Sequence, residues 1–180
     1  MPGCIFDTSC LINACAAAPL ETWLPRLGVG FLVPVAVQRE LLYLRGEDAQ
    51  GKPKREPIEL QRYVDLGILG VAEPSSAKEF EFYVGYAREL DDGEAMALAL
   101  ARSRALRLSS DDRKAIRLAR EAGVAVYDTP DILKSWWDKG AATPEDLSRA
   151  LENIRRHALY MPPKDHPLRN WWIEHSVGGA

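Results

Sequence analysis

The sequence predicts an α/β fold with a mostly parallel sheet of four or five strands and helices on both faces. Short apolar segments alternate with helical segments at the pace of βαβ units. The chain has 180 residues and is 47% hydrophobic, which is enough to build a core without disulfides or a structural metal. We expect one main domain over residues 1–140, with a C-terminal helix and an irregular tail over residues 141–180 packed on it.

Five short apolar segments are predicted to be the strands. Each is bounded by polar residues, glycine or proline, as strands usually are. In chain order they cover residues 3–7, 31–33, 68–72, 105–109 and 124–127. Because a helix-like segment follows most of them, parallel pairing through crossover helices is expected.

Helices are predicted where capping residues precede apolar residues at helical spacing. In chain order the predicted helices cover residues 8–18, 35–44, 58–66, 75–90, 93–104, 112–122, 129–139 and 144–160. Thr8 or Ser9 is expected to cap the first helix, and Asp92 the fifth. Small side chains nearly all round the fifth helix predict that it is buried against the sheet. Gly123 and Gly140 are expected to end the sixth and seventh.

Two segments are expected to be irregular. Residues 45–57 contain two glycines, two prolines and seven charges, which predicts an exposed loop and the most mobile part of the chain. Its cations Lys52, Lys54 and Arg55 are interpreted as solvating residues. The last 20 residues contain three prolines and are predicted to be irregular and partly loose.

Charge and cysteine content exclude several classes of protein. With a net charge of −3, the whole molecule does not attract nucleic acid or anionic membranes, so any such contact needs a local patch. The three cysteines, Cys4, Cys10 and Cys15, are too few for a disulfide framework and match no usual zinc spacing. No apolar run is long enough to span a membrane, and no basic signal segment opens the chain. We therefore expect a cytoplasmic protein with reduced thiols and no membrane contact.

Carboxylates follow the carboxyl ends of the predicted strands, which is where parallel α/β sheets bind ligands. They are Asp7, Glu40, Asp92, Glu94, Asp111 and Asp112. Taken singly, each has a simpler interpretation as a cap, a turn residue or a solvated residue. Together they would repel one another, and a divalent cation such as Mg²⁺ or Mn²⁺ removes that penalty. The set predicts phosphodiester hydrolysis by a metal-activated water.

Four segments with these acids, taken together, resemble a PIN domain. They are residues 5–12 (IFDTSCLI), residues 33–34 with Glu40 behind them, residues 92–99 (DGEAMALA) and residues 108–115 (LSSDDRKA). The resemblance covers about residues 3–140. It implies a three-layer α/β/α sandwich and cleavage of RNA that depends on Mg²⁺ or Mn²⁺. Many bacterial and archaeal members resemble VapC, the toxin of a toxin–antitoxin pair.

The resemblance also implies roles for the acids. Asp7, Glu40 and Glu94 match the first three acidic positions of the family. The fourth stays open between Asp111 and Asp112, with Asp112 slightly preferred. One or two metal ions are expected on Asp7, Glu94 and one of this pair. Glu40 is expected to complete the cluster or its outer shell.

Three further residues are expected around the metal ligands. Ser9 resembles the hydroxyl residue that orients a metal-bound water or a carboxylate, and Ser110 stands where the family often has threonine. Asp92 is expected behind the ligands. The resemblance also implies products with a 5′-phosphate and a 3′-hydroxyl.

Basic residues near the acids and near the C-terminus are candidates for RNA contacts. Arg113 and Lys114 follow the acidic pair directly and could reach a substrate phosphate. Arg155 and Arg156 belong to a basic stretch with interleaved aromatic residues, which suits single-stranded RNA. Solvated helix faces are the simpler interpretation of both pairs. Of the adjacent pair Trp136 and Trp137, one residue can be in the core and the other at the surface. The pair is a candidate for core packing, for homodimer contact or for antitoxin docking.

The sequence therefore favours a metal-dependent endoribonuclease, with RNA as substrate and a cognate antitoxin and a homodimer as candidate partners. The alternatives are a non-catalytic PIN-like module that binds RNA or protein, and a nuclease of the same chemistry that acts on DNA. A receiver-like signalling domain is disfavoured because the acidic pair comes after a late strand. A phosphatase with an Asp-x-Asp nucleophile is disfavoured because Ser9 stands where the second aspartate would be.

Overall fold

The computed structural model describes residues 3–176, which form two compact units. Each unit is assembled from three separate stretches of the chain. The first contains the chain up to Leu11, Gly28–Glu40 and Glu59–Asp128; the second contains Ile12–Leu27, Leu41–Ile58 and the chain from Thr129 onward.

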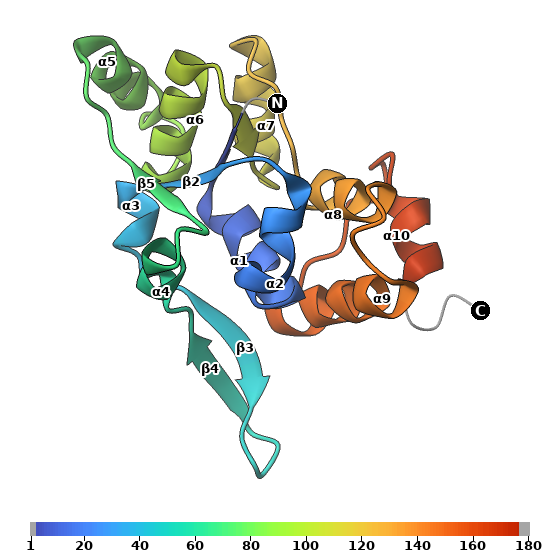
Figure 1. Cartoon of the computed structure of the whole chain (residues 1–180). Helices are drawn as coiled ribbons and strands as arrows, with labels where there is room; N and C mark the ends of the chain where they lie inside the picture. The colour runs from blue at the N-terminus through green and yellow to red at the C-terminus, as the bar shows by residue number, and fades with distance from the viewer. Residues whose placement is uncertain (1–2, 177–180) are drawn as a thin grey trace. The chain divides into compact units, whose positions relative to one another are not determined.

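A four-stranded parallel sheet is the centre of the first unit (Figure 1). Its strands, in the spatial order β5-β2-β1-β6, are β5 (Gly70–Ala72), β2 (Phe31–Pro34), β1 (Cys4–Phe6) and β6 (Arg107–Ser109). Leu108 forms one further parallel bridge with Val126, so the predicted last strand is reduced to a single bridge. The predicted α/β class with a central parallel sheet is confirmed.

Helices flank this sheet. In chain order they are α3 (Val35–Gln38), α4 (Leu60–Asp65), α5 (Ala77–Tyr86), α6 (Asp92–Arg104) and α7 (Arg113–Glu121), with α1 (Thr8–Ala17) beginning in this unit. The small apolar residues of α6 are buried with Ile5 and Leu108 of the sheet in one core cluster. The prediction that this helix is buried against the sheet, made from its small side chains, is therefore confirmed.

The second unit is mostly helical and has a hairpin. Its elements are α2 (Leu20–Trp23), the 3₁₀ turn η1 (Leu24–Leu27), β3 (Tyr43–Glu47), β4 (Pro53–Pro57), α8 (Thr129–Asp138), α9 (Pro144–Asn153), the π-helical turn η2 (Ile154–Ala158) and α10 (Arg169–His175). Trp136 is buried with its ring centroid 5.4 Å from that of Trp23. Trp137 lies edge-on to His175 of α10 at 5.2 Å.

The expected loop over residues 45–57 is wrong, because most of this segment is an antiparallel hairpin. The ladder runs from Tyr43 opposite Pro57 to Glu47 opposite Pro53. The two prolines lie at the two ends of β4, where a strand tolerates the loss of an N–H donor. The helix predicted over residues 35–44 ends at Gln38 because the chain beyond it turns into this hairpin.

The predicted irregular tail is also corrected, since α10 lies within it. Trp172 of α10 is 1% exposed and meets Tyr160 edge-on at 5.8 Å. Burial of this indole stabilises α10, a seven-residue helix that local sequence signals do not predict. The end of the expected tail, residues 177–180, lies outside the described residues. No helix in the described part of the chain is long and apolar enough to cross a membrane.

Candidate functional site

Asp7 lies directly after β1 with its side chain fully buried. Its Oδ1 accepts hydrogen bonds from the Cys10 backbone N–H at 2.8 Å and from the Ser9 hydroxyl at 2.9 Å. The Ser110 hydroxyl donates to Oδ2. Asp7 therefore caps α1, and the expectation that Thr8 or Ser9 is the cap is wrong. The carboxylate is held by three donors from two strand ends.

Burial governs the charge of Asp7. Desolvation raises the pKa of this carboxyl from 3.8 to about 7, although the hydrogen bonds from Ser110, Cys10 and Ser9 lower it. The nearby Asp111 carboxylate raises it further. No cationic side chain among the described residues forms an ion pair with Asp7. The group is thus a buried acid whose ionised form lacks a counter-charge.

Glu40 comes after the end of α3 and lies against the first turn of α6. Its Oε2 accepts a hydrogen bond from the Thr8 hydroxyl at 2.9 Å. A Cβ atom built on Gly93 would lie 2.7 Å from Glu40 Oε1 and 3.0 Å from Thr8 Oγ1. Thr8 and Gly93 are therefore part of the site, although the sequence predicts only a possible helix cap for Thr8 and no role for Gly93. Gly93 is needed here for space alone, since its helical backbone suits any residue.

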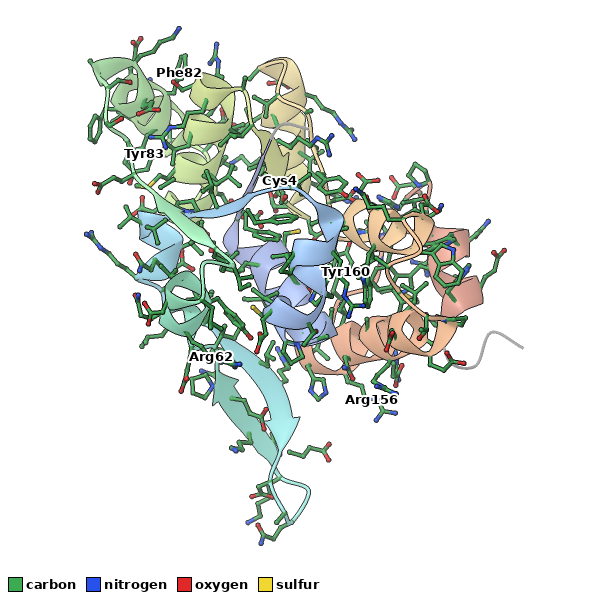
Figure 2. The ribbon with its side chains drawn as sticks, viewed as in Figure 1. Cys4, Arg62, Phe82, Tyr83, Arg156 and Tyr160 are labelled. Carbon is green, nitrogen blue, oxygen red and sulfur yellow. The ribbon has the colours of Figure 1, made fainter. Side chains whose placement is uncertain are left out.

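The N-terminus of α6 carries three acids. Asp91 is the N-cap, with φ −67° and ψ 160°, so the prediction that Asp92 is the cap is wrong. Asp92 instead accepts a hydrogen bond at 3.1 Å from the hydroxyl of Tyr83, a residue of α5 labelled in Figure 2. Glu94 is half-buried. Its pKa is raised by desolvation first and then by the carboxylates of Asp112, Asp91 and Glu40.

The acidic pair after β6 is tied to Asp7 through Ser110. The Asp112 backbone N–H donates to the Ser110 hydroxyl at 3.2 Å. Asp112 is also the N-cap of α7, because its Oδ1 accepts the backbone N–H groups of Lys114 and Ala115, both at 2.8 Å. Asp111 acts on the pKa of Asp7, whereas Asp112 acts on that of Glu94. The two acids thus raise the pKa values of different members of the set.

Five of the sequence-predicted acids therefore come from four segments to one edge of the sheet and influence one another electrostatically: Asp7, Glu40, Glu94, Asp111 and Asp112. Asp92 is bonded to Tyr83 instead. The oxygen donors of the five acids are of the type that hard divalent cations prefer. Over residues 3–176, however, no three His, Cys, Asp or Glu side chains converge tightly enough to form a ready metal site. The residues fit a divalent cation in chemical type, and binding would require the side chains to draw together.

The basic candidates have partners of their own. The Lys114 ammonium donates to the Glu89 carbonyl oxygen, and Arg113 is exposed beside it at the start of α7. In the second unit, Arg155 and Arg156 both pair with the Glu152 carboxylate. Arg155 forms two of these bonds, at 2.8 and 2.7 Å. These two arginines thus brace the end of α9.

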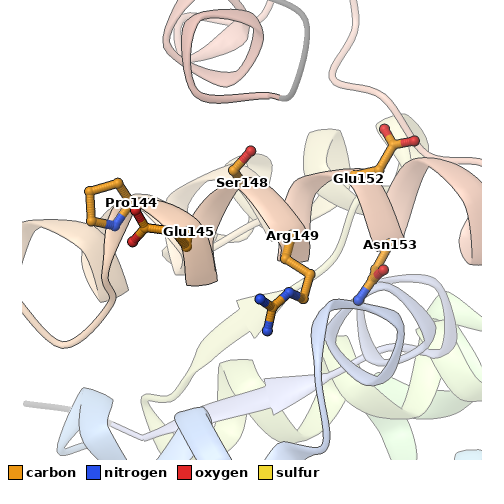
Figure 3. Close-up of a pocket in the computed structure, with 6 residues that line it drawn as sticks. All are labelled: Pro144, Glu145, Ser148, Arg149, Glu152 and Asn153. Carbon is orange, nitrogen blue, oxygen red and sulfur yellow. The ribbon is translucent and has the colours of Figure 1, made fainter.

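A hollow lies beside α9 in the second unit (Figure 3). Residues along one side of α9 line it: Pro144, Glu145, Ser148, Arg149, Glu152 and Asn153. Asn153 is engaged in packing, because its amide donates to the Ala17 carbonyl oxygen at 3.1 Å. None of the predicted site residues lines this hollow. Because its lining carries both acidic and basic side chains, we assign no ligand to it.

Comparison with known protein families gives a match over most of the chain. A family model described as PIN domain matches residues 3–166. This range contains every acid discussed above and extends past residue 140, through α9 and η2, to cover most of the second unit. No curated protein matches the chain.

Proposed function

Because the chain belongs to the PIN domain family, whose members are generally nucleases, we propose that it is a metal-dependent endoribonuclease. The observation that supports this most is the buried Asp7 carboxylate, which has three hydrogen-bond donors and no cationic partner among the described residues. A binding module without activity gains nothing from keeping such a costly charge. A bound divalent cation would compensate it.

The acids of the cluster would hold the metal ions. Asp7, Glu94 and one of Asp111 and Asp112 would hold one or two Mg²⁺ or Mn²⁺ ions, with Glu40 completing the cluster. When bound, the ion supplies a Lewis acid and an activated water for attack on phosphorus.

The neighbouring hydroxyls position these acids. Ser9 and Ser110 fix the orientation of the Asp7 carboxylate from opposite sides, and Thr8 holds Glu40 in place. Asp7 must lose its proton before it can act as a ligand, because its pKa without a cation is about 7. Arg113, at the start of α7, is offered as a contact for a substrate phosphate.

The experiment is sequencing of new 5′-phosphate ends in total RNA incubated with the protein and Mn²⁺. We expect new ends that disappear with chelator and with Asp7→Asn. Glu81→Gln, an exposed acid on α5, is the matched control and should cleave as the wild type does. Retained cleavage by Asp7→Asn would contradict the assignment of Asp7 to the active site. Cleavage of single-stranded DNA alone would establish the DNA-directed alternative, and no cleavage of either would favour a non-catalytic module.

We extend the proposal to a VapC-like toxin role in a toxin–antitoxin pair, which rests on the sequence resemblance. Induced expression of such a toxin should arrest the growth of a bacterial host. The arrest should vanish with Asp7→Asn and persist with Glu81→Gln. Growth that continues during strong expression of an active enzyme would contradict the toxin role while leaving the nuclease in place.

A further inference from the structure

The β3–β4 hairpin is a paired antiparallel ribbon, despite its loop-like composition (Figure 1). At its tip, Asp48 Oδ1 accepts the backbone N–H groups of Gln50 and Lys52, both at 2.9 Å. Gly51 adopts φ +75°, which closes the turn. At its base, the Ile58 N–H donates to the Leu42 carbonyl oxygen at 2.9 Å. Hydrogen bonds therefore close the ribbon at both its tip and its base.

One side chain from the helical part of the same unit also holds the ribbon. Nδ1 of His157, in η2, lies 2.6 Å from the Arg45 carbonyl oxygen. Because a carbonyl oxygen can only accept, Nδ1 carries the proton and donates. This bond anchors β3 at Arg45.

The cross-strand register places two arginines directly opposite each other. Arg45 of β3 pairs with Arg55 of β4. Both lie on the same face of the ribbon as Tyr43, since side chains alternate along a strand. The Arg55 guanidinium lies 4.2 Å from the centroid of the Tyr43 ring. We name these three residues, Tyr43, Arg45 and Arg55, the arginine face.

The two faces of the ribbon differ in how their cations are compensated. On the opposite face Lys54 pairs with Glu56 at 3.7 Å, and Glu56 lies over Gly46. Glu47 lies on the same face as Arg45 by the same alternation, but within the described chain neither Arg45 nor Arg55 is within ion-pair distance of a carboxylate. Like charges directly opposite each other destabilise a ribbon. An anion bound between the two guanidiniums would remove this cost.

The chemistry of the arginine face narrows the class of anion. Two guanidiniums offer planar, forked donors that match phosphate oxygens. Tyr43 is 37% exposed, so its ring adds a surface on which a nucleobase can stack beside the cations. An acidic peptide would pair with the two guanidiniums but would not need the exposed Tyr43 ring. The combination favours single-stranded RNA.

We propose that the arginine face of the β3–β4 hairpin binds single-stranded RNA through its phosphates and one stacked base. This contact shares no residue with the acidic cluster. The proposal rests on the proposed function in taking RNA as the substrate class. It replaces the interpretation of Arg55 as a solvating residue.

The test is the fluorescence anisotropy of a labelled 20-nucleotide single-stranded RNA titrated with the full-length protein in EDTA, where cleavage cannot occur. The test variant is Arg45→Gln/Arg55→Gln, and the matched control is Lys52→Gln/Lys54→Gln, which removes the same charge from the same hairpin. We expect the arginine variant to bind at least ten-fold more weakly and the lysine control to lose less than two-fold. Thermal melting checks the fold, and the arginine variant should melt no lower than the wild type.

Equal losses in the two variants, or no loss in either, would overturn the proposal. Binding of a glutamate-rich peptide to the arginine face, with RNA binding unchanged in the arginine variant, would also overturn it in favour of a protein partner. The cleavage assay with Mn²⁺ separates the two proposals. RNA binding that depends on the arginines without any cleavage would refute the nuclease alone, whereas cleavage without arginine-dependent binding would refute the hairpin alone.

Discussion

At the scale of single residues, burial and hydrogen bonding have opposite effects on the pKa of the Asp7 carboxyl. Its folded pKa of about 7 lies above the ordinary 3.8, so folding disfavours the ionised form. Stability from this group is therefore fully present below about pH 4 and is lost as the pH rises through about 7. Asp7→Asn removes that dependence and keeps an amide that can meet the same hydroxyls.

We therefore expect Asp7→Asn to be more stable than the wild type in EDTA at pH 7.5, by on the order of 1–4 kcal/mol. The difference should shrink as the pH falls towards 4. Urea unfolding of both proteins at several pH values between 4 and 8 measures it. A variant less stable than the wild type at pH 7.5 would mean that the aspartate is compensated in the folded protein. Mn²⁺ should raise the melting temperature of the wild type and leave that of the variant unchanged.

Gly93 is the second residue whose role depends on close packing. Alanine at this position would place its Cβ atom 2.7 Å from Glu40 Oε1 and 2.9 Å from Val37 Cγ2, so Glu40 must move. We expect Gly93→Ala to reduce the rate of metal-dependent RNA cleavage at least ten-fold while circular dichroism shows a folded protein.

The matched control for this change is Gly85→Ala in α5, where nothing lies within 4 Å of an added Cβ atom. Alanine there should leave cleavage unchanged and stabilise the helix by up to about 1 kcal/mol. Full activity in Gly93→Ala would show that the position of Glu40 does not matter for cleavage.

At the scale of elements, one carboxylate joins α5 to α6. Glu79 completes the capping box of α5 with Ser76 and forms an ion pair with Arg104 of α6 at 2.8 Å. Arg104 also donates to the Glu73 carbonyl oxygen at 2.7 Å. Hydrogen bonds from the Arg104 guanidinium and from the Ser75 backbone N–H lower the pKa of the 4% exposed Glu79 from 4.5 to about 2. A depressed carboxyl pKa stabilises the fold above the unfolded pKa, and that stabilisation is lost as the pH falls from about 4.5 to about 2.

Glu79→Gln should therefore lower the free energy of unfolding at pH 7 by up to roughly 3 kcal/mol. The deficit relative to the wild type should narrow by pH 3. Glu81→Gln, two residues along the same helix and exposed, should change stability by less than about 0.5 kcal/mol. Urea titrations of the three proteins at pH 7 and pH 3 provide the comparison, and a deficit independent of pH would show that the charge of Glu79 contributes nothing.

Elements with signals in adjacent residues could be predicted from the sequence. Elements that depend on contacts between residues distant in the chain could not. The helix α9 begins at Pro144 with a Thr143–Asp146 capping box, and both features can be read from adjacent residues. The β3–β4 hairpin depends on cross-strand pairing, and α10 depends on burial of Trp172. Such nonlocal contacts outweigh the glycines and prolines that make these segments resemble loops.

At the scale of the whole molecule, topology made the acidic site predictable in outline. Parallel strands deliver their carboxyl ends to one edge of the sheet, so residues as distant as Asp7 and Asp112 could be placed together from order alone. The details required interatomic distances. Neither the bond from Thr8 to Glu40 nor the clearance at Gly93 has a signature in the spacing of residues.

The net charge of −3 sets how binding to RNA should respond to salt. An acidic molecule has no general attraction for phosphates, so the response should reflect the few cations that touch them. In EDTA no metal ion holds a phosphate beside Arg113, so Arg45 and Arg55 are the cations counted. If they neutralise two phosphates, the logarithm of the association constant should fall with the logarithm of salt concentration at a slope of about −1.4. Affinity in EDTA should then drop about seven-fold between 50 and 200 mM salt.

Anisotropy titrations at four salt concentrations measure this slope. The slope should approach zero for Arg45→Gln/Arg55→Gln and stay unchanged for Lys52→Gln/Lys54→Gln. A slope several times steeper in the wild type would mean that many more cations meet the RNA, and the hairpin would then be a minor part of the interface. A shallow slope that the arginine variant abolishes would identify two side chains as the main electrostatic contact of an otherwise acidic protein with its RNA.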